Sequence, residues 1–289
     1  MGKVLIIADQ KGEGCALPRG LRMAALLGQE AEVVAFEYAP LAQLKLKGNG
    51  KAAVKSGLLE RRRKTLEGFI DKNAAEGQKV SLRVLWEKDV APWVCARCES
   101  GKYSYVVKTG RRTETLVHTS TDWALLRNCA APVLIVAENQ WRRTHPVMAA
   151  LDLASSGKVK KQLNETILAT AQALALAMDE KLEIICAVEV PALLRELDLV
   201  DTRSYVADAR AAMAPQVKSL AEKFSIPARA FKVKRGPVEK VIASEAAARR
   251  AQLVVMGTVG RKGIKARLIG NTAERVLQHL KTDVLAIRP

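Results

Sequence analysis

The two halves of this 289-residue chain carry the same order of sequence patterns. Each half opens with an apolar stretch that ends in aspartate, at 4–9 and again at 147–152. Near the end of each half, a helical pattern leads through a short polar gap into an apolar strand, at 122–136 and at 273–287. Such an internal repeat predicts two copies of one folding unit rather than a single larger core.

Short apolar strands alternate with amphipathic helices within each half. In the first half we expect strands at Lys3–Asp9, Glu32–Glu37, Val80–Trp86, Tyr105–Lys108 and Val133–Val136. In the second half we expect strands at Pro146–Asp152, Leu182–Val188, Ala228–Val233, Leu253–Gly257 and Val284–Arg288. The helices of the second half are predicted at Lys158–Met178, Asp208–Phe224, Val238–Ala251 and Thr272–Leu280. This alternation predicts an α/β fold with two tandem doubly wound domains, each a parallel sheet with helices on both faces.

The predicted domains are residues 1–138 and 146–289, joined by a short polar linker at 139–145. The N-terminal apolar stretch is too short for a signal peptide. The longest mostly apolar helical stretch, at 167–178, is too short to span a bilayer. The five cysteines are an odd number in a chain too large to need disulfides. We therefore expect a cytoplasmic protein without a membrane span.

The charge and the aromatic content limit the classes of partner. Lysine and arginine exceed aspartate and glutamate by 47 − 30 = 17, which favours anionic partners such as nucleotides, acidic lipids or nucleic acid. Aromatic residues make up only 4% of the chain, so that a nucleic-acid reader built on base stacking is disfavoured but not excluded. The densest basic runs, at 61–64 and 158–161, lie in helical patterns that are typical of solvated faces.

Three glycines mark a candidate phosphate site in the second half. Gly257 ends an apolar strand, Gly260 follows three residues later, and Gly270 precedes a helical pattern. Glycine lets backbone amides approach an anion closely, and a helix N-terminus presents unpaired N–H groups. Three unrelated turn glycines are the alternative, but their placement after a strand and before a helix favours phosphate binding.

The spacing Gly257-x2-Gly260-x9-Gly270 resembles the nucleotide-binding signature of the universal stress proteins. The match continues through Asn271, Thr272 and Ala273. The resemblance implies ATP or another adenine nucleotide as ligand. It also implies strand order 3-2-1-4-5 in each domain and a pseudo-dimer of the two domains within one chain. In ATP-binding members a serine or threonine follows the last glycine, where this chain has Asn271. The role expected first for Asn271 is that of an N-cap, in a capping-box pair with Glu274.

Ligands in doubly wound sheets bind at the carboxyl ends of the strands where the winding reverses. Asp152 ends the first strand of the second half, where its carboxylate would bond a ribose hydroxyl or an adenine amine, or would serve as a turn or cap residue. The resemblance matches Asp152 to the adenine-side aspartate of the family. It matches Ala187 to the residue whose backbone meets the adenine edge.

The first half lacks the glycines of this motif. Lys108 is aligned with Gly257, and Thr119 is aligned with Gly270. We therefore expect no ATP in the first half, and we expect Lys108 to be solvated unless it holds another anion. The run Thr121–Arg127 resembles an element of the two-domain, E-type universal stress proteins.

Other catalytic or metal motifs are weak. Cys95 and Cys98 are expected to lie on one face of a helix and to pack inward as structural residues, with a redox role as a minor alternative. Cys129 is expected to be isolated from them. No Gly-x-x-x-x-Gly-Lys-Ser/Thr loop and no Gly-x-Ser-x-Gly elbow is present.

We expect a stress-response protein that acts by binding nucleotide and not as an enzyme. The alternatives are slow ATP hydrolysis or autophosphorylation, and a carrier of an apolar or lipid-like ligand in the first-half crevice. A further homodimer remains open.

Overall fold

The chain divides into two compact units, Met1–Glu138 and Asn139–Pro289. The structure is a computed structural model. It describes residues 2–43, 49–110, 120–137, 141, 145–154, 157–191, 193–194, 201–258 and 270–289. Within these ranges, no helix combines the length and the apolar character that crossing a bilayer requires.

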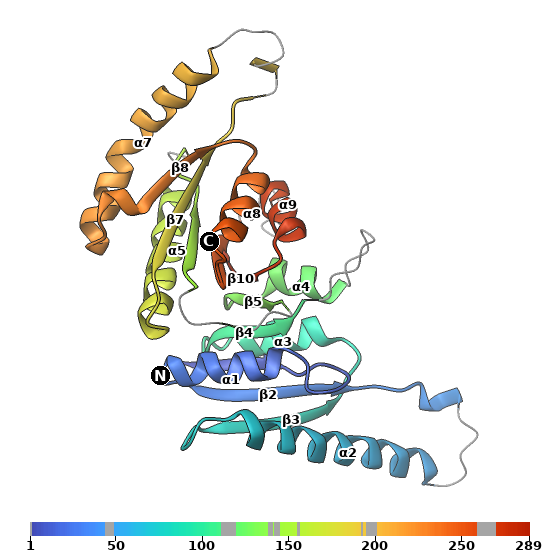
Figure 1. Cartoon of the computed structure of the whole chain (residues 1–289). Helices are drawn as coiled ribbons and strands as arrows, with labels where there is room; N and C mark the ends of the chain where they lie inside the picture. The colour runs from blue at the N-terminus through green and yellow to red at the C-terminus, as the bar shows by residue number, and fades with distance from the viewer. Residues whose placement is uncertain are drawn as a thin grey trace. The chain divides into compact units, whose positions relative to one another are not determined.

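The first unit is a five-stranded parallel sheet in the order β3-β2-β1-β4-β5 (Figure 1). Its strands are β1 (Lys3–Ile7), β2 (Glu30–Glu37), β3 (Val80–Trp86), β4 (Tyr103–Thr109) and β5 (Val133–Val136). Its helices are α1 (Ala16–Leu26), α2 (Gly50–Asn73), α3 (Val90–Cys98) and α4 (Ser120–Asn128), with a 3-10 turn η1 at Leu41–Gln43. Helix α1 packs beside α2, and α3 packs beside α4. The chain adds strands on one side of β1 as far as β3 and then on the other side, from β4 to β5. Because each crossover is right-handed, the two helix pairs cover opposite faces of the sheet.

The second unit repeats this order as β8-β7-β6-β9-β10. Its strands are β6 (Val147–Leu151), β7 (Leu182–Val188), β8 (Phe231–Arg235), β9 (Leu253–Gly257) and β10 (Asp283–Ile287). Its helices are α5 (Lys158–Ala177), α7 (Thr202–Phe224), α8 (Val238–Ala248) and α9 (Asn271–His279), with a 3-10 turn η2 at Ala228–Ala230. Both units therefore have the order 3-2-1-4-5, which confirms the predicted α/β class with two doubly wound sheets.

The central strand of each sheet is buried on both faces. Val4, Leu5 and Ile6 of β1 have no exposed surface, nor do Val147 and Met148 of β6. Helices on both sides exclude water from these strands, so that the side chains along their buried length must be apolar. This requirement explains the uninterrupted apolar runs at the front of each half.

A glycine lets the first helix of each unit approach the sheet closely, but the glycine lies on different elements. In the first unit it is Gly20 on α1, where an added Cβ would come within 2.5 Å of a side-chain carbon of Ile6. In the second unit it is Gly257 on β9, where an added Cβ would come within 2.6 Å of Leu163 on α5. The same packing problem therefore has two local solutions.

Several predicted element boundaries differ from the structure, among them the starts of α7, β8 and α9. Helix α7 begins at Thr202 rather than at Asp208, because the Asp201 carboxylate accepts hydrogen bonds from the N–H groups of Arg203 and Ser204. Residues 228–230 form η2, so that β8 begins at Phe231. Helix α9 begins at Asn271 with Gly270 at its N-cap position. The prediction that Asn271 is the N-cap is therefore wrong.

Candidate functional site

The predicted adenine-side residues meet at the carboxyl edge of the second sheet. In the register of β6 with β7, Leu151 lies opposite Cys186, so that Asp152 and Ala187 follow on neighbouring strands. On the other side of β6, β9 ends in Gly257 at the same edge. Strands β6 and β9 flank the point where the winding reverses, which is where doubly wound sheets place their ligands.

The backbone of Asp152 is held by Asn164 of α5. The Asn164 amide nitrogen donates to the Asp152 carbonyl oxygen at 2.7 Å, and the Asp152 N–H donates to the Asn164 side-chain oxygen at 3.1 Å. Asn164 is 2% exposed. This residue was missed by the sequence analysis, although an asparagine on the apolar face of a helical pattern is a usable signal, because buried polar groups need partners.

The Asp152 carboxylate itself points to solvent. Its side chain is 52% exposed and pairs with Lys160 at 2.7 Å, and the lysine side chain is 40% exposed. Such a pair between exposed side chains is weak and can separate at little cost. On the neighbouring strand β7, burial and, to a lesser extent, the Asp152 carboxylate raise the pKa of Cys186 to about 12. The site therefore combines a backbone held by Asn164, an accessible carboxylate and a neutral thiol on the next strand.

Gly257 and Thr258, at the carboxyl end of β9, both make contacts within the second unit. Gly257 makes room for Leu163 of α5. Thr258 is 4% exposed, and its hydroxyl donates to the carbonyl oxygen of Ile287 at 3.3 Å. The lack of a side chain at Gly257 thus allows α5 to pack against β9. The Thr258 hydroxyl is directed toward β10.

The N-terminus of α9 is built from the end of the glycine motif. Gly270 has extended backbone angles (φ −65°, ψ 140°), and its carbonyl accepts from the Glu274 N–H at 3.0 Å. Thr272 is exposed and Ala273 is buried. The first N–H groups of a helix have no partner within it and suit an anion. Gly260 and the side chain of Asn271 lie outside the described residues.

The register corrects the predicted alignment of the two halves by one residue. In the first unit Lys108 lies opposite Ile7, two residues before Asp9. In the second unit Met256 lies opposite Ala150, two residues before Asp152. Thr109, which follows Lys108, therefore occupies the position of Gly257.

Thr109 closes the first crevice around Asp9. The Thr109 hydroxyl donates to the Asp9 carboxylate at 2.6 Å and accepts from the Ala16 N–H at the start of α1, at 2.9 Å. Gly14 has φ +67° and lies so close to Asp9 that a side chain there would overlap its carboxylate. Asp9 is therefore engaged within the protein, whereas Asp152 is exposed.

Arg62 lies at the carboxyl ends of β1 and β2 in the same unit. This residue of α2 is 8% exposed, donates to the backbone carbonyl of Asp9, and lies 3.3 Å from the Glu37 carboxylate at the end of β2. The guanidinium thus joins the carboxyl ends of β1 and β2. Arg62 belongs to a basic run that the sequence analysis assigned to a solvated face, and for Arg62 that assignment is wrong.

Lys108 and Asp122 form an ion pair between the end of β4 and the first turn of α4. The lysine nitrogen lies 2.5 Å from Asp122, and the two side chains are 14% and 8% exposed. Asp122 is the third residue of α4, the position that Ala273 occupies in α9. An internal carboxylate therefore takes the place at the helix N-terminus where a ligand anion would be favoured. The expectation that Lys108 is solvated is wrong.

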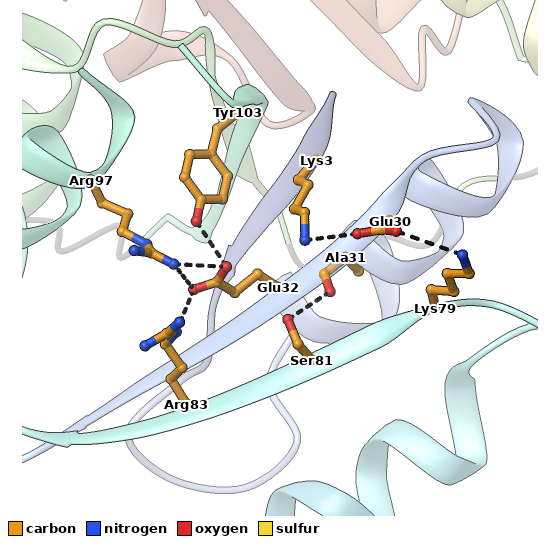
Figure 2. A network of polar contacts seen from close by, with 9 residues as sticks. All are labelled: Lys3, Glu30, Ala31, Glu32, Lys79, Ser81, Arg83, Arg97 and Tyr103. Carbon is orange, nitrogen blue, oxygen red and sulfur yellow. Dashed lines mark hydrogen bonds and ion pairs between the residues drawn. The ribbon is translucent and has the colours of Figure 1, made fainter. Parts of the chain in front are cut away.

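A second polar cluster of the first unit lies at the opposite end of β2 (Figure 2). Glu32 is 3% exposed and receives hydrogen bonds from Arg97 at 3.0 Å and from the Tyr103 hydroxyl at 2.8 Å, while Arg83 lies 2.9 Å away. Burial and the hydrogen bond to Glu32 raise the pKa of Tyr103 to about 12. Since this cluster joins β2, β3, β4 and α3 away from the crevice, we assign it a structural role.

Comparison with known proteins places this geometry in a family. Residues 160–288 match the model of the universal stress protein family. Universal stress protein E of Escherichia coli K12 is 30% identical over 245 residues, covering 83% of this chain and 78% of that protein. The chain belongs to the universal stress protein family. A homologue of universal stress protein E from Haemophilus influenzae is 29% identical over 238 residues, covering 80% of this chain and 77% of that protein.

Solved structures agree in fold over nearly the whole chain. A functionally unassigned protein from Pseudomonas aeruginosa PAO1 has a TM-score of 0.71 at 23% identity and covers 99% of this chain and 92% of its own. A universal stress protein from Archaeoglobus fulgidus has a TM-score of 0.64 at 15% identity and covers 99% and 98%. The family and the tandem architecture predicted from the repeated halves and the glycine spacing are thereby confirmed.

Proposed function

We propose that the second unit of this universal stress protein binds an adenine nucleotide at the carboxyl edge of β6, β7 and β9. The observation that carries the proposal is the contrast between two equivalent aspartates. Asp152 presents a 52% exposed carboxylate on a fixed backbone, whereas Asp9 is bound by Thr109. The Asp152 carboxylate is the more exposed of the two, and its partner Lys160 is itself 40% exposed and can move away.

The proposed contacts follow from the chemistry of each group. Asp152 accepts from a ribose hydroxyl or an adenine amine after Lys160 moves away, and the backbone of Ala187 meets the adenine edge. At the other end, the phosphates lie against backbone N–H groups of the glycine motif and the first turn of α9. The residues assigned to the phosphate side are Gly257, Gly260, Gly270, Asn271, Thr272 and Ala273.

We assign this unit a role in stress adaptation through binding rather than turnover. Asp152 is the carboxylate nearest the proposed ligand, and it is paired with Lys160. The alternative of an apolar ligand in the first crevice is not supported, because Arg62, Lys108 and Asp122 occupy that space with charged groups. The described part of the chain therefore favours one nucleotide site, in the second unit.

Matched substitutions at the two aspartates test the proposal. We expect Asp152→Asn to weaken ATP binding at least tenfold, because a hydrogen bond to a charged group contributes about 1.5–3 kcal/mol. Asp9→Asn, at the equivalent position of the first unit, should leave the affinity unchanged. Isothermal titration calorimetry of the full chain with ATP and AMP measures both, and circular dichroism verifies folding. Equal effects of the two substitutions would contradict the assignment.

Two further variants test the phosphate side. Gly270→Val should abolish binding, because the side chain would project where the amides are to meet phosphate. Asn271→Ser, which restores the hydroxyl of the ATP-binding members, should give equal or tighter binding. Unchanged affinity in Gly270→Val would show that phosphate lies elsewhere.

A further inference from the structure

Three cysteines of the first unit come together where α3 packs against α4. Cys95 and Cys98 lie one turn apart on α3, and Cys129 directly follows α4. The side chains of Cys95 and Cys98 are both within hydrogen-bonding reach of the Cys129 thiol and both influence its pKa. The expectation that Cys129 is isolated is therefore wrong, since the fold brings it to the Cys-x-x-Cys pair from 31 residues away along the chain (129 − 98 = 31).

The three thiols differ in their access to solvent. Cys129 has no exposed surface and Cys98 is 2% exposed, whereas Cys95 is partly exposed. Hydrogen bonding to Cys95 favours the Cys129 thiolate, but hydrogen bonding to Cys98 together with burial raises the pKa of Cys129 to about 12. A dissolved oxidant therefore reaches Cys95 before the two buried cysteines, and Cys129 is a protonated thiol at neutral pH.

Geometry favours a bond between α3 and Cys129 over a bond within α3. The Cβ atoms of residues three apart on a helix are about 5–6 Å apart, whereas a disulfide needs about 3.5–4.5 Å. A Cys95–Cys98 disulfide would therefore distort α3. Cys129 lies on a separate segment, directly after α4, and its thiol is within hydrogen-bonding reach of the Cys95 side chain.

We propose that Cys95 and Cys129 are an oxidation site that closes to an intrachain disulfide when the protein meets a peroxide. The Cys95 sulfur attacks one peroxide oxygen, the O–O bond breaks, and the sulfenic acid and one water are formed. The Cys129 sulfur then attacks the sulfenic sulfur, the S–S bond forms, and a second water leaves. Two thiols lose two electrons and two protons, and one peroxide becomes two waters.

Thiol counting and peptide mapping of the full chain test this proposal without reference to nucleotide. Reduced protein is treated with hydrogen peroxide, alkylated and digested. We expect the thiol count to fall by two from the five cysteines of the chain, with a cross-linked peptide that joins Cys95 to Cys129. Retention of all five thiols, or a cross-link between Cys95 and Cys98, would overturn the proposal.

Four single variants sharpen the result. Cys129→Ser should leave Cys95 as a sulfenic acid that dimedone traps, and Cys95→Ser, at the partly exposed position, should stop both steps. Cys98→Ser should still close. Cys186→Ser, at a buried cysteine of the second unit, is the matched control and should also close. Loss of two thiols in Cys129→Ser, or failure of Cys98→Ser to close, would contradict the assigned pair.

Discussion

Gly257 is a residue whose packing role can be separated from its proposed ligand role. A Cβ there would come within 2.6 Å of Leu163, which is only 4% exposed and has little room to move. We expect Gly257→Ala to lower the free energy of unfolding by about 1–3 kcal/mol, the usual cost of overpacking. Urea denaturation without nucleotide measures this change.

Gly57→Ala is the matched control. Gly57 lies within α2, and an added Cβ there meets nothing within 4 Å. This substitution should stabilise the protein by about 0.5–1 kcal/mol, because alanine loses less conformational entropy in a helix. If Gly257→Ala keeps full stability and loses only nucleotide affinity, then the glycine serves the ligand and not the packing of α5.

Ionisation of Tyr103 is expected to lower the free energy of unfolding of the first unit at high pH. Its pKa is raised from 10.0 to about 12 by burial and by the hydrogen bond to Glu32. Because the folded value is above the unfolded one, the stabilisation is complete below pH 10 and is lost as the pH rises through about 12. The free energy of unfolding should therefore fall less between pH 9 and pH 11 in Tyr103→Phe than in the unsubstituted protein.

Denaturant titrations at the two pH values give that comparison. Tyr38→Phe, at a tyrosine that is 53% exposed, is the control and should follow the unsubstituted protein. The same loss of stability in all three proteins would show that ionisation of Tyr103 is not linked to folding.

At the scale of elements, the apolar runs predicted the strands well. The predicted bounds Val80–Trp86, Leu182–Val188 and Leu253–Gly257 are those of β3, β7 and β9. These bounds were predicted correctly because polar residues flank each of the three strands on both sides, so that the pattern and the strand end together. Prediction shifted where a local feature decides the boundary, as at residues 228–230, which form a 3-10 turn after Pro227 instead of the start of β8.

The candidate site was predictable only in part. Asp152, Ala187 and Gly257 share one edge because parallel strands end together, which sequence patterns can indicate. The contacts of Arg62 and Lys108 depend on where long side chains reach across the fold. Sequence patterns carry no such information, and these contacts separate the two crevices.

The start of α7 shows how a cap extends a helix beyond its apolar pattern. The Asp201 pKa is lowered from 3.8, first by the backbone hydrogen bond from Ser204. This contribution to stability is therefore present above pH 4 and is lost as the pH falls through the lowered value. We expect Asp201→Ala to expose the amides of residues 203–204 to faster hydrogen exchange, while Asp208→Ala, inside the helix, should not. Equal exchange in both variants would contradict the capping role.

At the scale of the whole molecule, the internal pair Lys108–Asp122 is the clearest reason for the difference between the two crevices. Removing one partner leaves the other charge nearly buried, so that Asp122→Leu or Lys108→Met alone should each cost about 3–5 kcal/mol. The double variant should cost less than the sum of the two, because no charge is then left unpaired. Additive losses in a denaturation cycle would contradict a coupled pair.

The central claim is that one chain with two similar units holds one adenine nucleotide, in the second unit. Calorimetric titration of the full chain with ATP at low millimolar concentration tests it most directly, because the stoichiometry counts the competent crevices. We predict one site per chain, which Asp152→Asn weakens and Asp9→Asn does not affect. Two sites per chain, or no binding heat at millimolar ATP, would contradict the claim.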